Sequence, residues 1–445
     1  MSGRGSTTVA DQLTQRRIFV FWSPLAATWL MMAAEGPFLA AVIARLGEPT
    51  YNLAAFGVAL AIAMTVEAPV IMMMSAATAL VCDRQSLLAL RRFARMLNVG
   101  VTVLMVVVLL PPVFRLVALD VLGLPGPVER LAHQGVAVLL LWPAAIGYRR
   151  FYQGLLIRHH LTRRVAWGTV VRLATMAVTA LVLSATGAPG VTVGAAALAL
   201  GVVAEAAASR VMARRVAREL LERENGAGEP LTGGVIARFY APLALTSLLT
   251  LGLQPLLTFF LARSRLPIQS LAVLPVINGL LFLLRSPGIG FQEAALALAG
   301  ERRENVPALR RFAASLATAL SGTLALIAFT PLARLWFEGV SGLSAALAAL
   351  AVVPTRLLVA LPALEVVMAL QRALLLVGRT TRSITVATGL EVAVVAMALG
   401  ALTGPAGLVG IVAVGAAWPC GRLVAVAYLR RRLRAASGAS AVGRG

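Results

Sequence analysis

The stretch FWSPLAATWLMMAAEGPFLAAVIAR, residues 21–45, returns as FYAPLALTSLLTLGLQPLLTFFLAR at residues 239–263, without a gap and at an offset of 218. Identical pairs include Phe21 and Phe239, Pro24 and Pro242, Leu25 and Leu243, Ala26 and Ala244, Thr28 and Thr246, Pro37 and Pro255, Ala44 and Ala262, and Arg45 and Arg263. After one inserted residue, ALRRFA at 89–94 repeats at 308–313. An internal repeat on this scale indicates two similar halves.

Both copies are too apolar for a soluble domain, and so is the whole chain, which is 59% hydrophobic and 13% charged. A membrane-spanning helix needs roughly 20 apolar residues. The sequence predicts twelve such segments, at 18–44, 52–81, 99–123, 132–156, 165–187, 191–209, 236–262, 269–298, 313–335, 344–376, 384–403 and 407–428. The basic stretch 85–98 is expected to be an amphipathic helix lying on the membrane surface.

The net charge of +22 would suggest nucleic acid as the partner of a soluble protein. In a membrane protein, arginine-rich connections mark the cytoplasmic side instead. Arginines gather at the N-terminus and in alternate connections, for example at 91–95, 158–164, 210–218, 310–311 and 430–432. We therefore expect both termini in the cytoplasm, an inner-membrane location, contact with anionic membrane lipids, and no nucleic-acid partner.

Six spans in each half give both halves the same orientation. The expected fold is an all-α polytopic membrane protein with two six-helix bundles, related by a pseudo-two-fold axis along the membrane normal. The bundles are predicted to comprise residues 1–223 and 235–445, joined by a cytoplasmic linker at 224–234. Two bundles that enclose a cleft can rock and expose one site to either side alternately, which is the geometry of a transporter.

Three features resemble the MOP flippase superfamily: the 6+6 layout, PLA early in the first helix of each half, beginning at Pro24 and Pro242, and RRFYQGLLIRHHLTRR at 149–164. Within it, the chain is most similar to bacterial MATE-like multidrug exporters and to the progressive ankylosis family. The major facilitator superfamily is the rival, but CDRQSLLALRRFAR at 82–95 lacks the glycines of its signature loop.

Charged residues inside hydrocarbon are the candidates for function, because each costs roughly 2.5–3.5 kcal/mol unless it faces a cavity or a partner. Glu67 and its repeat equivalent Arg285 both lie near the predicted midplane, two residues before Pro69 and Pro287. We expect these two residues to face the cleft and to pair across it when it is empty. A permanent structural ion pair is the alternative. The expected helix breaks are at Pro37, Pro69, Pro255, Pro287, Gly288 and Gly290.

Glu35 lies in the first span, just before Gly36 and Pro37. Removal from water favours the neutral carboxyl group, so such a residue can exchange protons. The resemblance adds that MATE-like exporters use an acid in the first helix for cation coupling. It also implies that Gln254 stands where the sodium-linked subgroup carries an acid in the seventh helix, which favours protons over sodium. The alternative is a glutamate capped by Thr28 or Thr250.

Guanidinium groups recognise carboxylates and phosphates. The spans hold five further arginines that would suit an anionic substrate, namely Arg149, Arg150, Arg172, Arg356 and Arg372. Glu365 and Glu391 are expected to neutralise them in the alternative interpretation. No ATP-binding, metal-binding or enzymatic motif is present in the sequence, so we expect no cofactor, no metal and no catalysis.

Together, the residues and the resemblance predict a monomeric, proton-coupled antiporter that exports amphipathic organic molecules. An exporter or flippase for organic anions or lipid-linked phosphates is the second prediction. A membrane scaffold without transport activity is the third.

Overall fold

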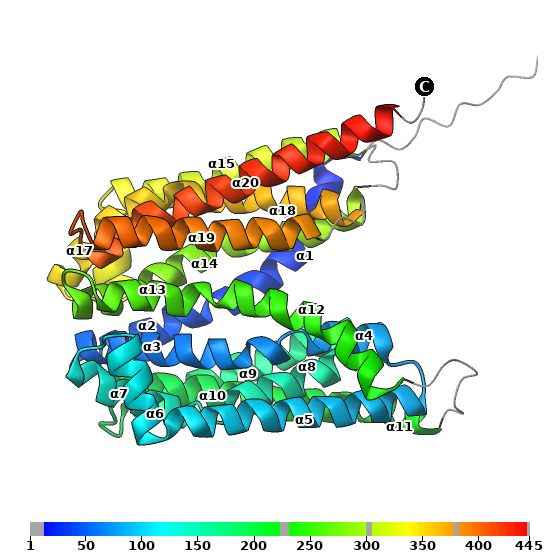
Figure 1. Cartoon of the computed structure of the whole chain (residues 1–445), viewed down its shortest axis with the longest axis horizontal. Coiled ribbons are helices and arrows are strands. Elements are labelled where there is room, and N and C mark those ends of the chain that lie inside the picture. The colour runs from blue at the N-terminus through cyan, green and yellow to red at the C-terminus, as the bar shows by residue number, and fades with distance from the viewer. Residues whose placement is uncertain (1–12, 223–230, 300–304, 378–381, 443–445) are drawn as a thin grey trace, which may run out of the picture.

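The computed structural model describes residues 13–222, 231–299, 305–377 and 382–442. Within these ranges the chain is helical, and twelve helical spans are long and apolar enough to cross a membrane. The predicted fold class is confirmed. Figure 1 shows the helices stacked in two bundles, the lower built largely from the first half of the chain and the upper largely from the second. Most of the predicted linker, residues 224–230, lies outside the described residues.

Helices of the first half follow one another as six spans with short connections. They are α1 (Gln15–Ala33), α2 (Glu35–Ala44), α3 (Pro49–Glu67), η1 (Ala68–Val70), α4 (Met73–Leu80), α5 (Arg84–Leu109), α6 (Pro111–Arg115), η2 (Leu116–Val121), α7 (Gly126–Val138), α8 (Trp142–Arg158), α9 (Thr162–Ser184), α10 (Gly190–Met212) and α11 (Arg214–Glu222).

Helices of the second half follow the same order. They are α12 (Gly233–Leu251), α13 (Leu253–Ala262), α14 (Pro267–Leu298), α15 (Val306–Phe329), α16 (Leu332–Arg334), η3 (Leu335–Val340), α17 (Ala345–Leu357), η4 (Leu358–Ala360), α18 (Leu361–Val377), α19 (Arg382–Thr403) and α20 (Gly410–Val442).

The third span differs from the prediction. Helix α5 is continuous from Arg84 to Leu109, so residues 85–98 are the first turns of a spanning helix and not a separate surface helix. Its start is fixed by a capping box, in which the Asp83 carboxylate accepts a 2.9 Å hydrogen bond from the backbone N–H of Ser86. Pro111 and Pro112 follow its end. Arginines in the first turns of α5 do not end the span, because long side chains can reach the headgroups from a spanning helix.

The ninth span shows the same shift. Helix α15 occupies Val306–Phe329, and Thr330 and Pro331 follow it, whereas the prediction placed the span at 313–335.

Proline effects differ between the halves. The first span is interrupted at Ala34, three residues before Pro37, and the seventh at Gly252, three residues before Pro255. The second span is interrupted at η1, which contains Pro69. Helix α14, by contrast, runs without interruption through Pro287.

The expected break at Gly288 and Gly290 is therefore absent. A Cβ on Gly288 would lie 3.1 Å from Cγ2 of Val366, and one on Gly290 would lie 3.2 Å from the backbone nitrogen of Ala26. These glycines permit close helix packing, which is the reason for small residues at many helix interfaces in membranes.

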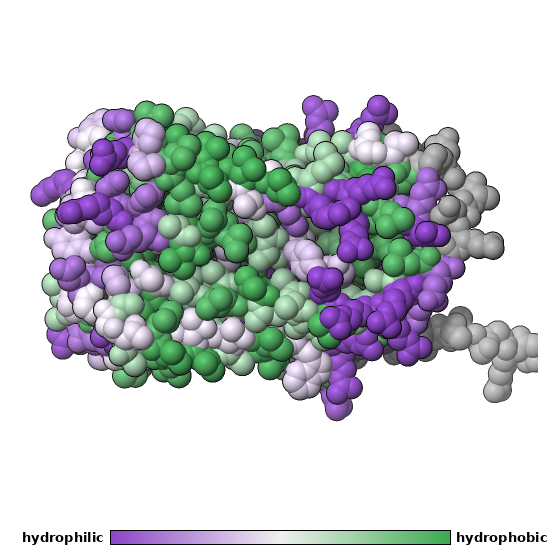
Figure 2. Space-filling model, turned by 90° about the horizontal axis from the view of Figure 1, so that it is seen from below, coloured by the Kyte–Doolittle hydropathy of each residue, from purple (hydrophilic) through white to green (hydrophobic). Residues whose placement is uncertain are grey.

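The two ends of the molecule differ in charge. One end, which we call the basic end, carries the connections with Arg91, Arg163, Arg214, Arg311 and Arg430, and the last helix, α20, ends there (Figure 1, right). Figure 2 shows an apolar band across the middle of the face seen there, with hydrophilic residues gathered at both ends. This pattern fits a chain whose middle is covered by hydrocarbon.

Helices α1 and α12 cross between the bundles. Although α2 packs against α3 and α10 of its own half, α1 packs along α14 and contacts α15 in the other half. Reciprocally, α12 packs against η1 and α5 of the first half. Figure 1 shows both crossings as diagonal helices. Each half of the sequence therefore gives one half-span to the opposite bundle at the basic end.

Candidate functional site

A buried ionic network occupies the first bundle. Glu35 at the start of α2 pairs with Arg172 of α9, and Arg149 of α8 pairs with Glu205 of α10. Glu205 also accepts a 3.0 Å hydrogen bond from Gln153 Nε2 and lies 3.5 Å from Arg172 Nη1. Four helices thus meet through charged side chains at a depth where a single charge would be strongly unfavourable.

Glu67 lies beside this network but outside its ion pairs. Its side chain is 4% exposed, and its Oε2 has no hydrogen-bond partner among the described residues. Arg150, Arg149 and Arg172 supply the nearby positive charge. Glu67 closes α3, directly before η1, so it sits at the interruption of the second span. A buried carboxylate without a direct partner is energetically costly, which makes Glu67 a candidate for function.

A second buried network occupies the other bundle. Arg285 of α14 donates a 2.9 Å hydrogen bond from Nε to Glu365 of α18, which also accepts a 3.1 Å bond from Arg422 Nη1. Arg422 of α20 in turn pairs with Glu391 of α19 at 2.9 Å. The Arg285 guanidinium also lies 5.3 Å from the ring centroid of Trp418.

The two networks occupy related places with reversed polarity. Arg172 and Glu391 are equivalent at an offset of 219, so an arginine in the fifth span corresponds to a glutamate in the eleventh. Their partners are also reversed, because Arg172 contacts Glu205 of the sixth span and Glu391 contacts Arg422 of the twelfth. Two pairs of equivalent positions, 67/285 and 172/391, thus carry charges of opposite sign in the two halves, whereas the other charged residues of the networks have uncharged equivalents.

The expected pair of Glu67 and Arg285 is not formed. Arg285 binds Glu365 inside its own bundle, and Glu67 remains among the arginines of the first bundle. The repeat relates their positions but does not require contact, because each bundle offers a nearer partner of opposite charge. The ion pairs of the two networks are thus formed within each bundle and not between the bundles.

The remaining predicted residues lie in varied surroundings. Arg356 donates a 3.0 Å hydrogen bond to the carbonyl of Ala328 and stacks over Phe329, away from both networks. Gln254 accepts a 3.3 Å bond from Asn278. Arg372 lies near the second network, and its Nε has no partner among the described residues. The described residues contain no group of three His, Cys, Asp or Glu side chains placed to hold a metal.

Sequence reasoning missed Glu205 and Arg422, the central residues of the two networks. Both lie inside predicted spans, at 191–209 and 407–428, so the rule that selected Glu67 also selects them. Another signal was the match of Arg45 with Arg263, which form equivalent contacts between the bundles, described below.

The crossing half-helices are held by equivalent contacts. Trp22 of α1 donates a 2.9 Å hydrogen bond to the carbonyl of Pro287, and Tyr240 of α12 donates a 2.6 Å bond to that of Pro69. Trp22 and Tyr240 are equivalent at the 218 offset, as are the two prolines. Each aromatic ring also packs edge-on against an equivalent phenylalanine, Phe312 or Phe93, with centroids 5.4 and 5.3 Å apart.

Two further equivalent contacts join the bundles at the opposite end. Arg45 Nη2 donates hydrogen bonds of 2.6 and 3.0 Å to the carbonyls of Gly339 and Val340. Arg263 Nη2 donates a 2.8 Å bond to the carbonyl of Asp120. We call the Arg45 and Arg263 contacts the latches. The bundles also approach closely eight residues before Arg45, since a Cβ on Gly279 would lie 3.1 Å from Pro37.

No protein-family model and no curated protein sequence matches the chain. Solved structures do. An inward-facing multidrug resistance MATE transporter of the MOP superfamily has a TM-score of 0.70 and 16% identity, covering 94% of this chain and 98% of its own. The lipid II flippase MurJ, in an inward closed conformation, has a TM-score of 0.70 and 11% identity, with coverage of 93% and 87%.

A MOP superfamily transporter from Pyrococcus furiosus, whose binding pocket is described as having reverse polarity, has a TM-score of 0.59 and 16% identity, with coverage of 98% and 99%. All three matches extend over nearly the whole chain, including both bundles. The chain therefore has the fold of the MATE transporters of the MOP superfamily.

Proposed function

We propose that the protein is a secondary active transporter that works by alternating access, with the basic end and both termini in the cytoplasm of a bacterial cell and the spans in its inner membrane. The observation that carries this proposal is the difference between the two ends. Paired latches join the bundles at one end, whereas each bundle at the basic end is contacted by a half-helix of the other. Such an arrangement favours opening toward the basic end.

The proposed moving units are the two six-helix bundles, residues 1–223 and 235–445, with a monomer as the transporting species. Helix interruptions at Ala34 and Gly252 supply bending points. Helix α1 packs on the second half, whereas α2 also packs on α3 and α10 of the first; α12 packs on η1 and α5, whereas α13 also packs on α14 and α19. A change between inward-open and outward-open states would then break the latches and rotate the half-helices at these interruptions.

Coupling is proposed to use a proton at Glu67. Its carboxylate is buried beside arginines and has no direct partner among the described residues. It lies two residues before Pro69, whose carbonyl receives the Tyr240 hydrogen bond. Loss or gain of a charge at Glu67 would therefore act next to the docking site of α12. Glu35 is paired with Arg172, so its proposed part is to organise the arginines around Glu67.

The proposed cargo is an amphipathic organic molecule, which is exported in exchange for protons that enter down their gradient. A multidrug transporter among the structural neighbours supports this class. The test is uptake of a fluorescent amphipathic cation into proteoliposomes under an imposed pH gradient. We expect gradient-dependent flux for the native protein and loss of at least nine tenths of it for Glu67→Gln. Glu219→Gln is the matched control, because Glu219 pairs with Arg215 on the surface.

Three outcomes would contradict parts of this proposal. Unchanged flux in Glu67→Gln would remove the proton assignment but keep the transporter, whereas absence of flux for every cargo would favour a scaffold. Gradients of sodium and of protons are imposed separately, so that the coupling ion is read directly. A sodium-driven flux without any proton effect would also overturn the assignment.

An anionic cargo is the second candidate, and the second network favours it. That network sets three arginines, Arg285, Arg372 and Arg422, against two glutamates, Glu365 and Glu391. Arg285 has its side chain 14% exposed, against 7% for Glu365. Organic anions and labelled lipid-linked phosphates in the same vesicles distinguish the two classes. Faster flux of an anion that is lost in Arg285→Gln would select the second candidate.

A further inference from the structure

A groove of about 870 Å³ lies on the outer face of the first bundle, between α5, α8 and α10. Its walls are largely apolar side chains that remain exposed, including Val99, Val103, Leu141 and Val203, which are 62, 55, 59 and 40% exposed. This groove is separate from the ionic networks, which are buried inside the bundles. Exposed apolar walls at this depth suit hydrocarbon chains.

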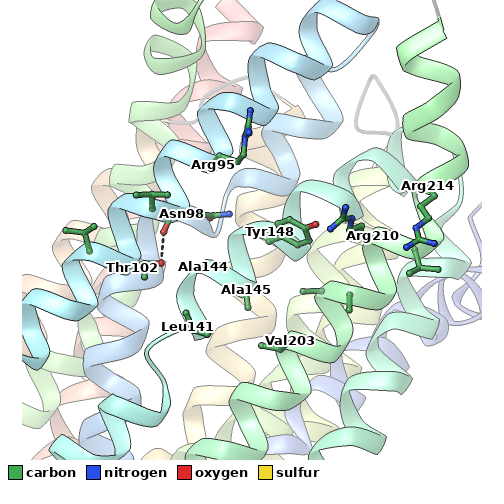
Figure 3. Close-up of a pocket in the computed structure, with 15 residues that line it drawn as sticks. Arg95, Asn98, Thr102, Leu141, Ala144, Ala145, Tyr148, Val203, Arg210 and Arg214 are labelled. Atoms are coloured by element: carbon green, nitrogen blue, oxygen red, sulfur yellow. Dashed lines mark hydrogen bonds between the residues drawn. The ribbon is translucent and has the colours of Figure 1, made fainter.

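One end of the groove is strongly basic. Arg95, Arg210 and Arg214 line it there together with Tyr148, and Figure 3 shows these side chains around the same opening. None of the three arginines forms a hydrogen bond or ion pair with another described residue, and all three are exposed. Other arginines of the same region do find partners, such as Arg164, which donates to the carbonyl of Met212.

The distance along the groove fits one lipid leaflet. Eight residues separate Arg95 from Val103 on α5, and eleven separate Val203 from Arg214 along α10 and α11. At a rise of 1.5 Å per residue these intervals are roughly 12 and 16 Å. Half of a hydrocarbon core is about 15 Å thick. The arginines therefore stand at headgroup level when the apolar walls stand in the acyl region.

The second bundle has a related groove of about 680 Å³ between α15, α18 and α20, the helices equivalent to α5, α8 and α10. Its basic end carries Arg310, Arg430 and Arg434. Arg430 and Arg434 are equivalent to Arg210 and Arg214 at an offset of 220. A pair of arginines thus recurs in the same place in both halves, whereas the equivalent buried residues Arg172 and Glu391 differ in the sign of their charge.

We propose that each groove binds one anionic phospholipid of the leaflet at the basic end, with the phosphate between the arginines and the acyl chains along the apolar walls. Guanidinium groups bind phosphate oxygens in pairs, and each arginine near an anionic surface adds to the attraction. The two lipids would sit on opposite outer faces. The inference requires only the membrane-spanning fold and holds for any cargo.

The experiment counts lipids that stay bound to the purified full-length protein by native mass spectrometry, after addition of phosphatidylglycerol or phosphatidylcholine. We expect two tightly retained phosphatidylglycerol molecules. The triple variant Arg95→Gln, Arg210→Gln and Arg214→Gln is expected to retain one, with on the order of tenfold or greater loss of affinity at its groove. The variant Arg310→Gln, Arg430→Gln and Arg434→Gln is expected to lose the other.

The matched control is Arg92→Gln, Arg163→Gln and Arg218→Gln, which removes the same charge at the same end from exposed positions outside both grooves. It is expected to keep both lipids. Equal losses in the control and in the groove variants would overturn the proposal in favour of general electrostatic attraction. Equal retention of phosphatidylcholine would overturn it as well.

A second variant tests the apolar wall. Ala207→Trp fills the first groove without any change of charge, and Leu181→Trp, at a 65% exposed position on α9, is its control. We expect Ala207→Trp to lose one phosphatidylglycerol and Leu181→Trp to lose none. Competition by inorganic phosphate distinguishes a lipid from a free anion. Displacement of the lipid by millimolar phosphate, or an unchanged lipid count in Ala207→Trp, would contradict the proposal.

Discussion

At the scale of single residues, the bundles are organised by arginines and glutamates whose charges are satisfied locally. Arg422 contacts both Glu365 and Glu391, and Glu205 is contacted by Arg149, Arg172 and Gln153. Removal of one member leaves a buried charge without its partner, which is more damaging than removal of a complete pair. Replacement of one charged residue is therefore expected to cost more folding stability than replacement of both residues of an ion pair.

Arg422→Gln is predicted to destabilise the folded protein by about 3–5 kcal/mol, because Glu391 loses the cation that it contacts. In the double variant with Glu391→Gln, Glu365 keeps Arg285, so part of the loss is restored. Thermal unfolding in detergent, combined as a double-mutant cycle, measures the coupling. A double variant less stable than Arg422→Gln would contradict this account.

The sequence predicted that charges inside spans matter, and the structure brings Glu35, Arg149, Arg172, Arg285 and Glu365 into ion pairs. It did not predict which partners they find. Repeat equivalence suggested that Glu67 would meet Arg285, but pairing depends on distances between helices within a bundle, and these follow from packing that no single sequence interval encodes.

At the scale of elements, glycines set how closely the helices approach. A Cβ on Gly154 of α8 would lie 2.5 Å from the Cβ of Ala77 and 2.6 Å from the carbonyl oxygen of Met74. Gly100 of α5 has no neighbour within 4 Å of the same position. The contrast separates glycines needed for packing from those that only lower helix propensity.

Gly154→Ala is accordingly predicted to lower the unfolding temperature, since backbone atoms of α4 cannot move away without loss of the contact between α4 and α8. Overpacking of this kind costs about 1–3 kcal/mol. Gly100→Ala is the control and should stabilise the protein by up to about 1 kcal/mol through helix propensity. Circular dichroism during heating compares the two, and equal melting temperatures would refute the packing argument.

The number of spans followed from hydropathy alone, yet their ends did not. Arg84, Arg91 and Arg95 lie in the first turns of α5, where a window of apolar residues cannot recognise a helix that extends into the headgroup region. Prolines also did not predict helix interruptions consistently. Pro69 lies in an interruption, whereas Pro287 lies inside a continuous helix whose neighbours hold it in place.

At the scale of the whole molecule, the two bundles are joined by four repeat-related contacts. Trp22 and Tyr240 hold the crossing half-helices, and Arg45 and Arg263 hold the opposite end. In the proposed alternating-access mechanism, the Arg45 and Arg263 latches exist only while that end is closed, so they add stability to this state alone. Loss of these hydrogen bonds is expected to shift the conformational equilibrium toward the state that is open at the latched end.

The double variant Arg45→Ala and Arg263→Ala is predicted to raise the population open at that end about tenfold, if the latches together contribute about 1.4 kcal/mol. Spin labels at Thr186→Cys and Ala406→Cys, with Cys82 and Cys420 replaced by serine, report the distance between the bundles by pulsed electron resonance. We expect a longer distance component in the double variant.

The control is Arg115→Ala and Arg334→Ala, a repeat-related pair of exposed arginines at the same end with no hydrogen bond or ion pair to other described residues. Their removal changes the charge by the same amount and leaves the latches intact. If both double variants gave the same distances, a general charge effect and not the latches would explain the shift.

The reciprocal exchange of α1 and α12 has a consequence for ancestry. A single half, made as its own polypeptide, would present a docking surface for an arm and an arm for the same surface on a second copy. Two such copies would form a closed, symmetric pair with swapped arms, and neither would be complete alone. A fusion of two such genes would require a tether but no new interface. Each copy could then diverge in the sign of its interior charges.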